Sequence, residues 1–153
     1  MKKLIIKGGN QLSGTIKIGG AKNSVVGLLP ATILTNGKCK IYNVPNISDV
    51  NKLDAMLQKL GSVIKRTDDL LEIDNKNVQN VEIDREYASS IRASYYFMGA
   101  LLSKYHKAVI SYPGGCVIGS RPIDLHIKGF EKMGAHVEIE DNTYTITADE
   151  LHG

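Results

Sequence analysis

The sequence has no tryptophan, two phenylalanines and two cysteines among its 153 residues. Because Cys39 and Cys116 are the two cysteines and no secretion signal accompanies them, we expect reduced thiols in the cytoplasm rather than a disulfide framework. Two distant cysteines and four histidines without shared spacing argue against zinc, so we expect no metal and no cofactor. The few aromatic residues and the lack of a recognisable motif argue against a nucleic-acid-binding domain.

Long apolar runs are also missing. The apolar run Leu4–Ile6 is too short for a signal peptide, and no later run approaches the length of a membrane span. Hydrophobic content of 42% and charged content of 23% are ordinary for a soluble globular chain that can bury one core. The net charge of +3, with scattered basic residues, suits an anionic small molecule as well as a nucleic acid.

Apolar periodicity predicts alternating helices and strands, which indicates an α/β (α+β in some schemes) fold. Pro30 predicts a kink in the first helix, Ser48 is expected to cap the second, and glycines 61 and 134 are expected to end two helices. We expect helices over residues 22–35, 48–60, 88–103 and 122–133, and strands over residues 4–6, 15–18, 38–44, 62–66, 70–73, 108–112, 135–139 and 143–147.

The order helix–strand–helix–hairpin occurs twice. Residues 40–45 align with residues 108–113 at an offset of 68, whereas residues 57–61 align with 130–134 at an offset of 73. The five extra residues fall between Gly114 and Arg121, and an insertion in one copy of a repeat is where special chemistry is expected. Chance similarity of two short segments is the alternative.

The inserted loop contains Cys116, several glycines and Arg121, and Pro122 then opens a predicted helix. Glycines let backbone N–H groups approach a ligand, a helix N-terminus favours anions, and arginine binds phosphate or carboxylate with two hydrogen bonds. A thiol in such positive potential loses its proton readily. The loop lacks the Gly-Lys-Ser/Thr ending of a P-loop and the Gly-x-Gly-x-x-Gly pattern of a dinucleotide-binding loop. We therefore predict an anion site with a reactive sulfur.

Three segments together resemble the UDP-N-acetylglucosamine 1-carboxyvinyltransferases. They are Gly19-Gly20-Ala21-Lys22-Asn23-Ser24, Arg92-Ala93-Ser94, and Pro113-Gly-Gly-Cys116-x4-Arg121-Pro122-x-Asp124-Leu125-His126. The resemblance covers the whole chain and the N-terminal portion of the family proteins. It implies an inside-out α/β barrel built from such repeats, of which two are present here.

The resemblance also implies a reaction. Family members transfer the enolpyruvyl group of phosphoenolpyruvate to the 3-hydroxyl of UDP-N-acetylglucosamine and release phosphate, which commits the sugar nucleotide to peptidoglycan synthesis. By the same resemblance, Cys116 is the loop cysteine that takes part in protonation and is alkylated by fosfomycin. Lys22 and Arg121 hold phosphoenolpyruvate in this scheme, and Asn23 contacts the sugar.

Further implied roles concern substrate binding. Arg92 matches an anion-contacting arginine, whereas Arg121, Pro122, Asp124 and Leu125 match the turn around the uracil ring. Simpler structural roles exist for some of these residues: a solvated lysine at position 22, a helix cap at Asn23, or a surface arginine at position 92.

We expect residues 1–20 to form a strand pair that belongs with a second domain, and residues 21–153 to form part of a first domain. Its repeats span about residues 22–80 and 86–148. Because the family's general base lies in a region that this chain does not match, we expect the chain alone to be catalytically incomplete. A stand-alone anion- or RNA-binding α/β module is the alternative, and an inactive remnant that associates with the intact enzyme is a third possibility.

Overall fold

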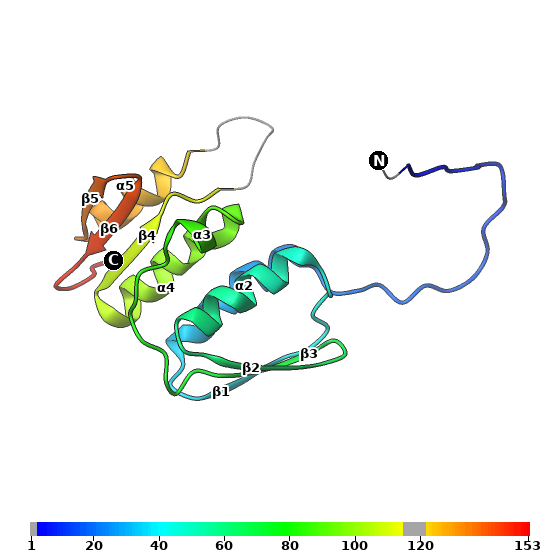
Figure 1. The fold of residues 1–153 in the computed structure, drawn as a ribbon, viewed down its shortest axis with the longest axis horizontal. Coiled ribbons are helices and arrows are strands. Elements are labelled where there is room, and N and C mark those ends of the chain that lie inside the picture. The colour runs from blue at the N-terminus through cyan, green and yellow to red at the C-terminus, as the bar shows by residue number, and fades with distance from the viewer. Residues whose placement is uncertain (1–2, 115–121) are drawn as a thin grey trace.

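The computed structural model describes residues 3–114 and 122–153 and contains two three-stranded sheets with helices between them (Figure 1). Each sheet turns one face to the helices, so buried and exposed side chains alternate along its strands. The first unit comprises α1 (Lys22–Ala31), the 3₁₀ turn η1 (Thr32–Leu34), β1 (Lys38–Ile41), α2 (Ser48–Lys59), β2 (Val63–Thr67) and β3 (Leu70–Asp74).

The second unit follows the same order after a short connecting region. The connection holds α3 (Arg85–Ala88) and the 3₁₀ turn η2 (Arg92–Tyr95). The unit itself comprises α4 (Tyr96–Tyr105), β4 (Lys107–Ser111), α5 (Asp124–Lys132), β5 (His136–Glu140) and β6 (Thr143–Thr147).

The two sheets have identical topology, which confirms the predicted repeat. Their strand orders are β1-β3-β2 and β4-β6-β5, and all neighbours are antiparallel. The strand pairing gives an offset between the two units that is one residue larger than predicted for the first strands. Cys39 faces Ile73 and Ala108 faces Ile146, an offset of 69 within the first strands rather than 68. The extra residue of the first unit is accommodated near Asn43, whose φ is +57°.

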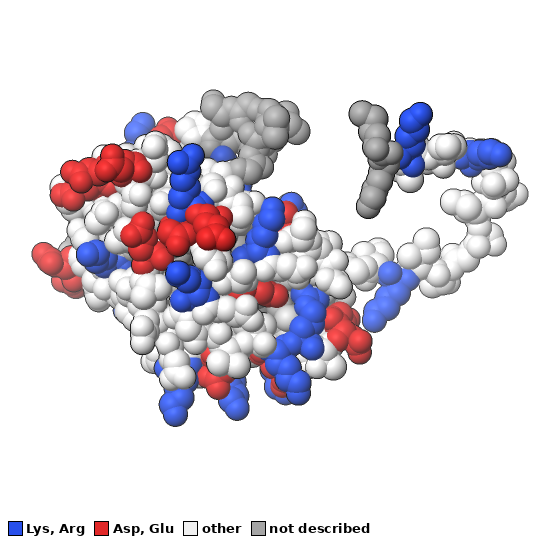
Figure 2. Space-filling view, in the orientation of Figure 1, with Lys and Arg blue, Asp and Glu red and all other residues white. Residues whose placement is uncertain are grey.

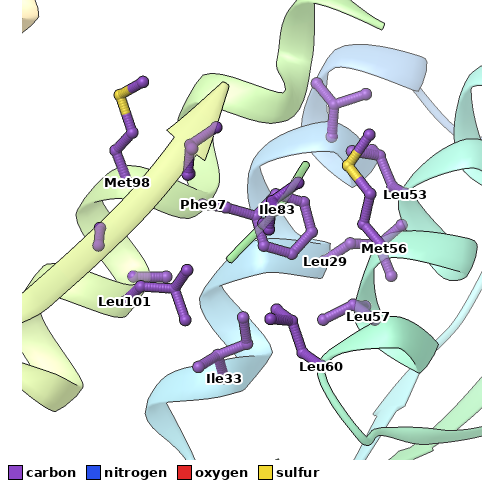
Figure 3. Packing of buried hydrophobic residues seen from close by; sticks show 14 of the residues in the cluster. Leu29, Ile33, Leu53, Met56, Leu57, Leu60, Ile83, Phe97, Met98 and Leu101 are labelled. Atoms are coloured by element: carbon purple, nitrogen blue, oxygen red, sulfur yellow. The ribbon is translucent and has the colours of Figure 1, made fainter. Parts of the chain in front are cut away.

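The hydrophobic core lies where helices of both units meet. Leu29 of α1 and Ile33 of η1 pack with Leu57 of α2 and with Phe97 and Leu101 of α4, and all five side chains are fully buried (Figure 3). One continuous core therefore joins the repeats, and the two units form a single folded body.

The predicted helix over residues 88–103 is wrong in its first part. Ile91 is extended (φ −151°, ψ 139°), and it separates α3 from η2. The Ser89 and Ser90 hydroxyls bond back to the carbonyls of Arg85 and Tyr87. Serines that bond to nearby backbone favour helix ends over helix interiors, and this explains the break.

Other helix boundaries also differ from expectation. α1 gives way to a 3₁₀ turn just after Pro30, as expected for a residue without an N–H group. Ser48 is the first residue of α2 and makes no capping bond, because Ile47 occupies the cap position. Gly61 and Gly134 end their helices as predicted, with φ of +105° and +97°.

Residues 3–20 form an exposed, extended arm without regular secondary structure (Figure 1). The expected strands at 4–6 and 15–18 are therefore not formed. Six large apolar side chains of the arm are more than 80% exposed: Leu4, Ile5, Ile6, Leu12, Ile16 and Ile18. A two-stranded hairpin without a packed face is marginally stable, so the apolar pattern alone does not suffice to form one.

Acidic and basic side chains are interspersed over the face of the molecule shown in Figure 2. This agrees with the scattered charge of the sequence. Within residues 3–114 and 122–153, no helix combines the length and the apolar character needed to cross a bilayer.

Asp54 is expected to make stability depend on pH. It lies half-buried on α2, and its Oδ1 has no hydrogen-bond partner among residues 3–114 and 122–153. Burial raises the pKa of Asp54 to about 6 against the opposing effect of Arg66. Since the folded state then binds the proton more tightly than the unfolded state, this contribution to stability is lost as pH rises through 6.

Asp54→Asn removes the charge that burial disfavours. We expect the variant to be about 1 kcal/mol more stable than the wild type at pH 7, after allowance for partial exposure, and the difference to vanish near pH 4. Urea unfolding of both proteins between pH 4 and 7.5 measures it. A stability difference independent of pH would contradict this explanation.

Candidate active site

A cavity of about 370 Å³ lies at the junction of the two units. α1 and α2 line one side, and the Ser90–Tyr96 segment lines the other. Three cationic side chains and one carboxylate line it, so its charge favours an anion. The lining residues are Lys22, Asn23, Val26, Asp49, Lys52, Ser90, Ile91, Arg92, Ala93, Tyr95 and Tyr96.

Lys22 is the first residue of α1, where a positive charge opposes the helix dipole. An ion pair with Asp49 offsets this unfavourable interaction, and the Lys22 Nζ lies 2.8 Å from the Asp49 Oδ2. Asp49 lies in the first turn of α2, where a carboxylate is favourable. The pair is half-exposed on the lysine side, so an incoming anion can reach the ammonium.

Asn23 is the second residue of the same helix and therefore is not its cap. Ala21 occupies the cap position, makes no side-chain capping bond, and no acidic residue lies in the first turn. Among the described residues, no side chain caps the first N–H groups of α1 beside the cavity. Such helix N-termini bind phosphate and carboxylate groups.

Arg92 opens η2 on the opposite side of the cavity. Its guanidinium carbon lies 5.8 Å from the centre of the Tyr95 ring, a cation–π contact that restricts the arginine. Tyr95 stacks on Tyr96 with ring centres 4.4 Å apart and contacts His126 at 4.8 Å. Burial, and then the interaction with Tyr96, raises the pKa of Tyr95 to about 12, so its hydroxyl stays protonated at neutral pH.

The structure thus brings together three of the predicted site residues, Lys22, Asn23 and Arg92, from two separate sequence segments. It adds Asp49 and Lys52, which the sequence analysis missed. Their spacing of three residues places both on one face of the predicted helix, but this spacing does not tell a face that lines a cavity from one that meets solvent.

The remaining predicted residues lie elsewhere. Pro122 precedes α5 and Asp124 and Leu125 begin it; all three are exposed, and none is among the described residues that line the cavity. They are linked to the cavity wall through the contact between His126 and Tyr95. Cys116 and Arg121 lie outside the described residues.

Gly114, the last described residue before that gap, is held against the region of Arg92. Its N–H donates to the Ala88 carbonyl at 3.2 Å, and a Cβ at this position would overlap the Ser89 carbonyl. Ala88 also accepts a 2.9 Å hydrogen bond from the buried hydroxyl of Ser94. The Ala88 carbonyl therefore accepts hydrogen bonds both from Gly114, which follows β4, and from Ser94 of η2, the 3₁₀ turn that begins with Arg92.

The cavity offers fixed positive charge. Across the described part of the chain, no three His, Cys, Asp or Glu side chains are close enough to ligate one ion. Ammonium, guanidinium and helix N–H groups together suit a phosphate or a carboxylate, and an asparagine amide beside them suits a hydroxyl.

Comparisons of this chain with known proteins identify its family. A profile described as EPSP synthase (3-phosphoshikimate 1-carboxyvinyltransferase) matches residues 6–151. The chain is 50% identical over its whole length to a UDP-N-acetylglucosamine 1-carboxyvinyltransferase of Clostridium botulinum and 47% identical to one of Streptococcus pneumoniae. It spans 37% of the length of each of these relatives.

Solved structures share the fold. The enolpyruvyl transferase NikO from Streptomyces tendae superposes with a TM-score of 0.79 at 22% identity, over 95% of this chain and 32% of that one. EPSP synthase from Acinetobacter baumannii superposes with a TM-score of 0.60 at 17% identity, over 92% of this chain and 33% of that one. With its paired sheets, its repeat and a matched span of nearly its full length, the chain belongs to the EPSP synthase (3-phosphoshikimate 1-carboxyvinyltransferase) family.

Proposed function

We propose that the chain supplies part of an enolpyruvyl transferase that joins phosphoenolpyruvate to UDP-N-acetylglucosamine. In this reaction the sugar 3-hydroxyl oxygen bonds to C2 of phosphoenolpyruvate. The hydroxyl proton is removed and C3 gains a proton, which gives a tetrahedral ketal. C3 then loses a proton as the C2–O bond to phosphate breaks, so that the double bond re-forms and inorganic phosphate leaves. The chain is 50% identical, over its own whole length, to a transferase of that name, and this supports UDP-N-acetylglucosamine over a shikimate substrate.

One observation carries the proposal: Lys22, Asn23 and Arg92 line one cavity although 69 residues separate the last two. Phosphoenolpyruvate carries a phosphate and a carboxylate, so its binding requires several fixed cations. A preorganised cluster of positive charge also stabilises the anionic charge that shifts towards the leaving phosphate.

Several finer roles follow from this proposal. Cys116 and Arg121 complete the site from the adjoining loop, with Cys116 as the proton donor and the target of fosfomycin. Pro122, Asp124 and Leu125 contact the uracil ring. The reaction belongs to peptidoglycan synthesis in the cytoplasm. The arm of residues 3–20 packs on a further domain that contributes the general base.

Ligand selectivity tests the function. We expect the chain to bind UDP-N-acetylglucosamine more tightly than UDP, because the sugar adds contacts to Asn23 and its neighbours. We also expect no phosphate release with phosphoenolpyruvate present, because the chain spans 37% of the relatives' length. Isothermal titration and a phosphate assay measure both, with Cys116→Ala as the control for turnover.

Equal affinity for UDP and the sugar nucleotide, with salt-dependent affinity for single-stranded RNA, would contradict the proposal and favour a nucleic-acid-binding module. Phosphate release that Cys116→Ala abolishes would show instead that the chain is catalytically complete.

A further inference from the structure

Lys52 makes a hydrogen bond across the cavity from α2 of the first unit to the connecting region. Its Nζ donates to the backbone carbonyl of Ser90 at 2.7 Å, over a separation of 38 residues. Lys52 belongs to α2, which also carries Asp49, the partner of Lys22. Ser90 lies two residues before Arg92. The bond therefore connects the Lys22 side of the cavity with the Arg92 side.

The face of α2 that carries Lys52 lies along the connecting region between the units. Lys59, two helical turns further along, lies 3.9 Å from the Asp84 carboxylate and 5.7 Å from the centre of the Tyr87 ring. Both lysines thus join α2 to the connecting region, but of the two only Lys52 is among the described residues that line the cavity. Lys59 is a matched comparison for it.

The segment held by Lys52 is irregular backbone. Ile91 is extended between α3 and η2, so no helix continues through it to fix Arg92. The Tyr95 ring restricts the guanidinium, and η2 runs directly into α4 on the C-terminal side of Arg92. On its N-terminal side, the backbone of Arg92 is set by how residues 89–91 are anchored. A charged donor to a half-buried carbonyl is a strong anchor for such a segment.

We propose that Lys52 is a positioning residue that holds the Arg92-bearing segment against the Lys22 side of the cavity, and that it thereby sets the affinity for a phosphate-bearing ligand. This inference rests on the proposed function of the same site. Lys52 acts through Arg92, whereas Lys59 contributes only to the packing of α2 against the connecting region.

Binding of phosphoenolpyruvate and of inorganic phosphate to the chain tests the inference. Lys52→Met is expected to raise the Kd for phosphoenolpyruvate about tenfold, equivalent to about 1.4 kcal/mol. Lys52→Arg keeps a charged donor of similar reach and is expected to stay within about threefold of the wild type. Lys59→Met is expected to stay within about twofold, and circular dichroism checks that all variants are folded.

A double-mutant cycle with Arg92→Met separates positioning from direct ligand contact. If Lys52 acts through Arg92, Lys52→Met adds little to the loss already caused by Arg92→Met. Fully additive losses, an unchanged Kd in Lys52→Met, or an equal loss in Lys59→Met would each overturn the positioning role. A wild-type chain that binds neither ligand would overturn the proposed function as well, so the two failures are distinguishable.

Discussion

Lys22→Met is expected to weaken phosphoenolpyruvate binding to the chain by about 100-fold. The substitution removes the ammonium at the N-terminus of α1, and a hydrogen bond to a charged group contributes about 1.5–3 kcal/mol. It also leaves the Asp49 carboxylate, now without its 2.8 Å partner, facing an anionic ligand. Both effects weaken the binding of the anionic ligand. Isothermal titration measures the change in Kd.

The double variant Lys22→Met/Asp49→Asn tests the second effect. Removing the unpaired carboxylate is expected to recover part of the lost affinity without restoring wild-type binding. Thermal unfolding provides a control, because a half-exposed ion pair contributes little to stability and the unfolding temperature should change by only a few degrees. Wild-type affinity in Lys22→Met would exclude this lysine from the site.

Gly20→Ala is expected to destabilise the chain by about 1–3 kcal/mol and to weaken ligand binding. A Cβ on Gly20 would overlap the backbone carbonyl oxygen of Asn43 and would lie 3.3 Å from the ring of Pro45. A backbone atom cannot turn away as a flexible side chain can. The chain before α1 must therefore shift, and the shift moves Lys22, two residues along.

Gly19→Ala is the matched control for this prediction. A Cβ on Gly19 would meet no atom of the described part of the chain within 4 Å, so we expect nearly unchanged stability and binding. Urea unfolding and phosphoenolpyruvate titration of both variants provide the comparison. Equal behaviour of the two alanine variants would show that the contact between Gly20 and Asn43 does not position α1.

The repeat was predictable because its signals are local. Helical apolar spacing, turn residues such as Asp141 and Asn142, and the glycines that end two helices each depend on a few neighbouring residues. Both hairpins, α2 and the strands of both units were found in this way. The arm shows the limit of such signals, since its apolar residues match a strand pattern without a surface on which to pack.

The break before η2 was not predictable from periodicity. The apolar spacing of residues 88–103 continues through it, whereas at the break serine hydroxyls bond to nearby carbonyls and the distant Lys52 donates to the Ser90 carbonyl. Tertiary contacts of this kind override helical propensity. The break matters for the site because it directs Arg92 towards the cavity.

The site itself was predicted in parts. The resemblance selected Lys22, Asn23 and Arg92, and the structure places them around one cavity. Asp49 and Lys52 were missed because no local pattern distinguishes a charged helix residue that faces a cavity from one that faces solvent. Only the packing of α2 against α1 and the connecting region makes that distinction.

Amide chemical-shift mapping of the chain during titration with phosphoenolpyruvate tests the location of the anion site most directly. We predict the largest shifts at Lys22, Asn23 and Arg92, and their loss in the Lys22→Met variant. Largest shifts at the exposed lysines of the first sheet, Lys38, Lys40 and Lys65, would contradict a site between the two units.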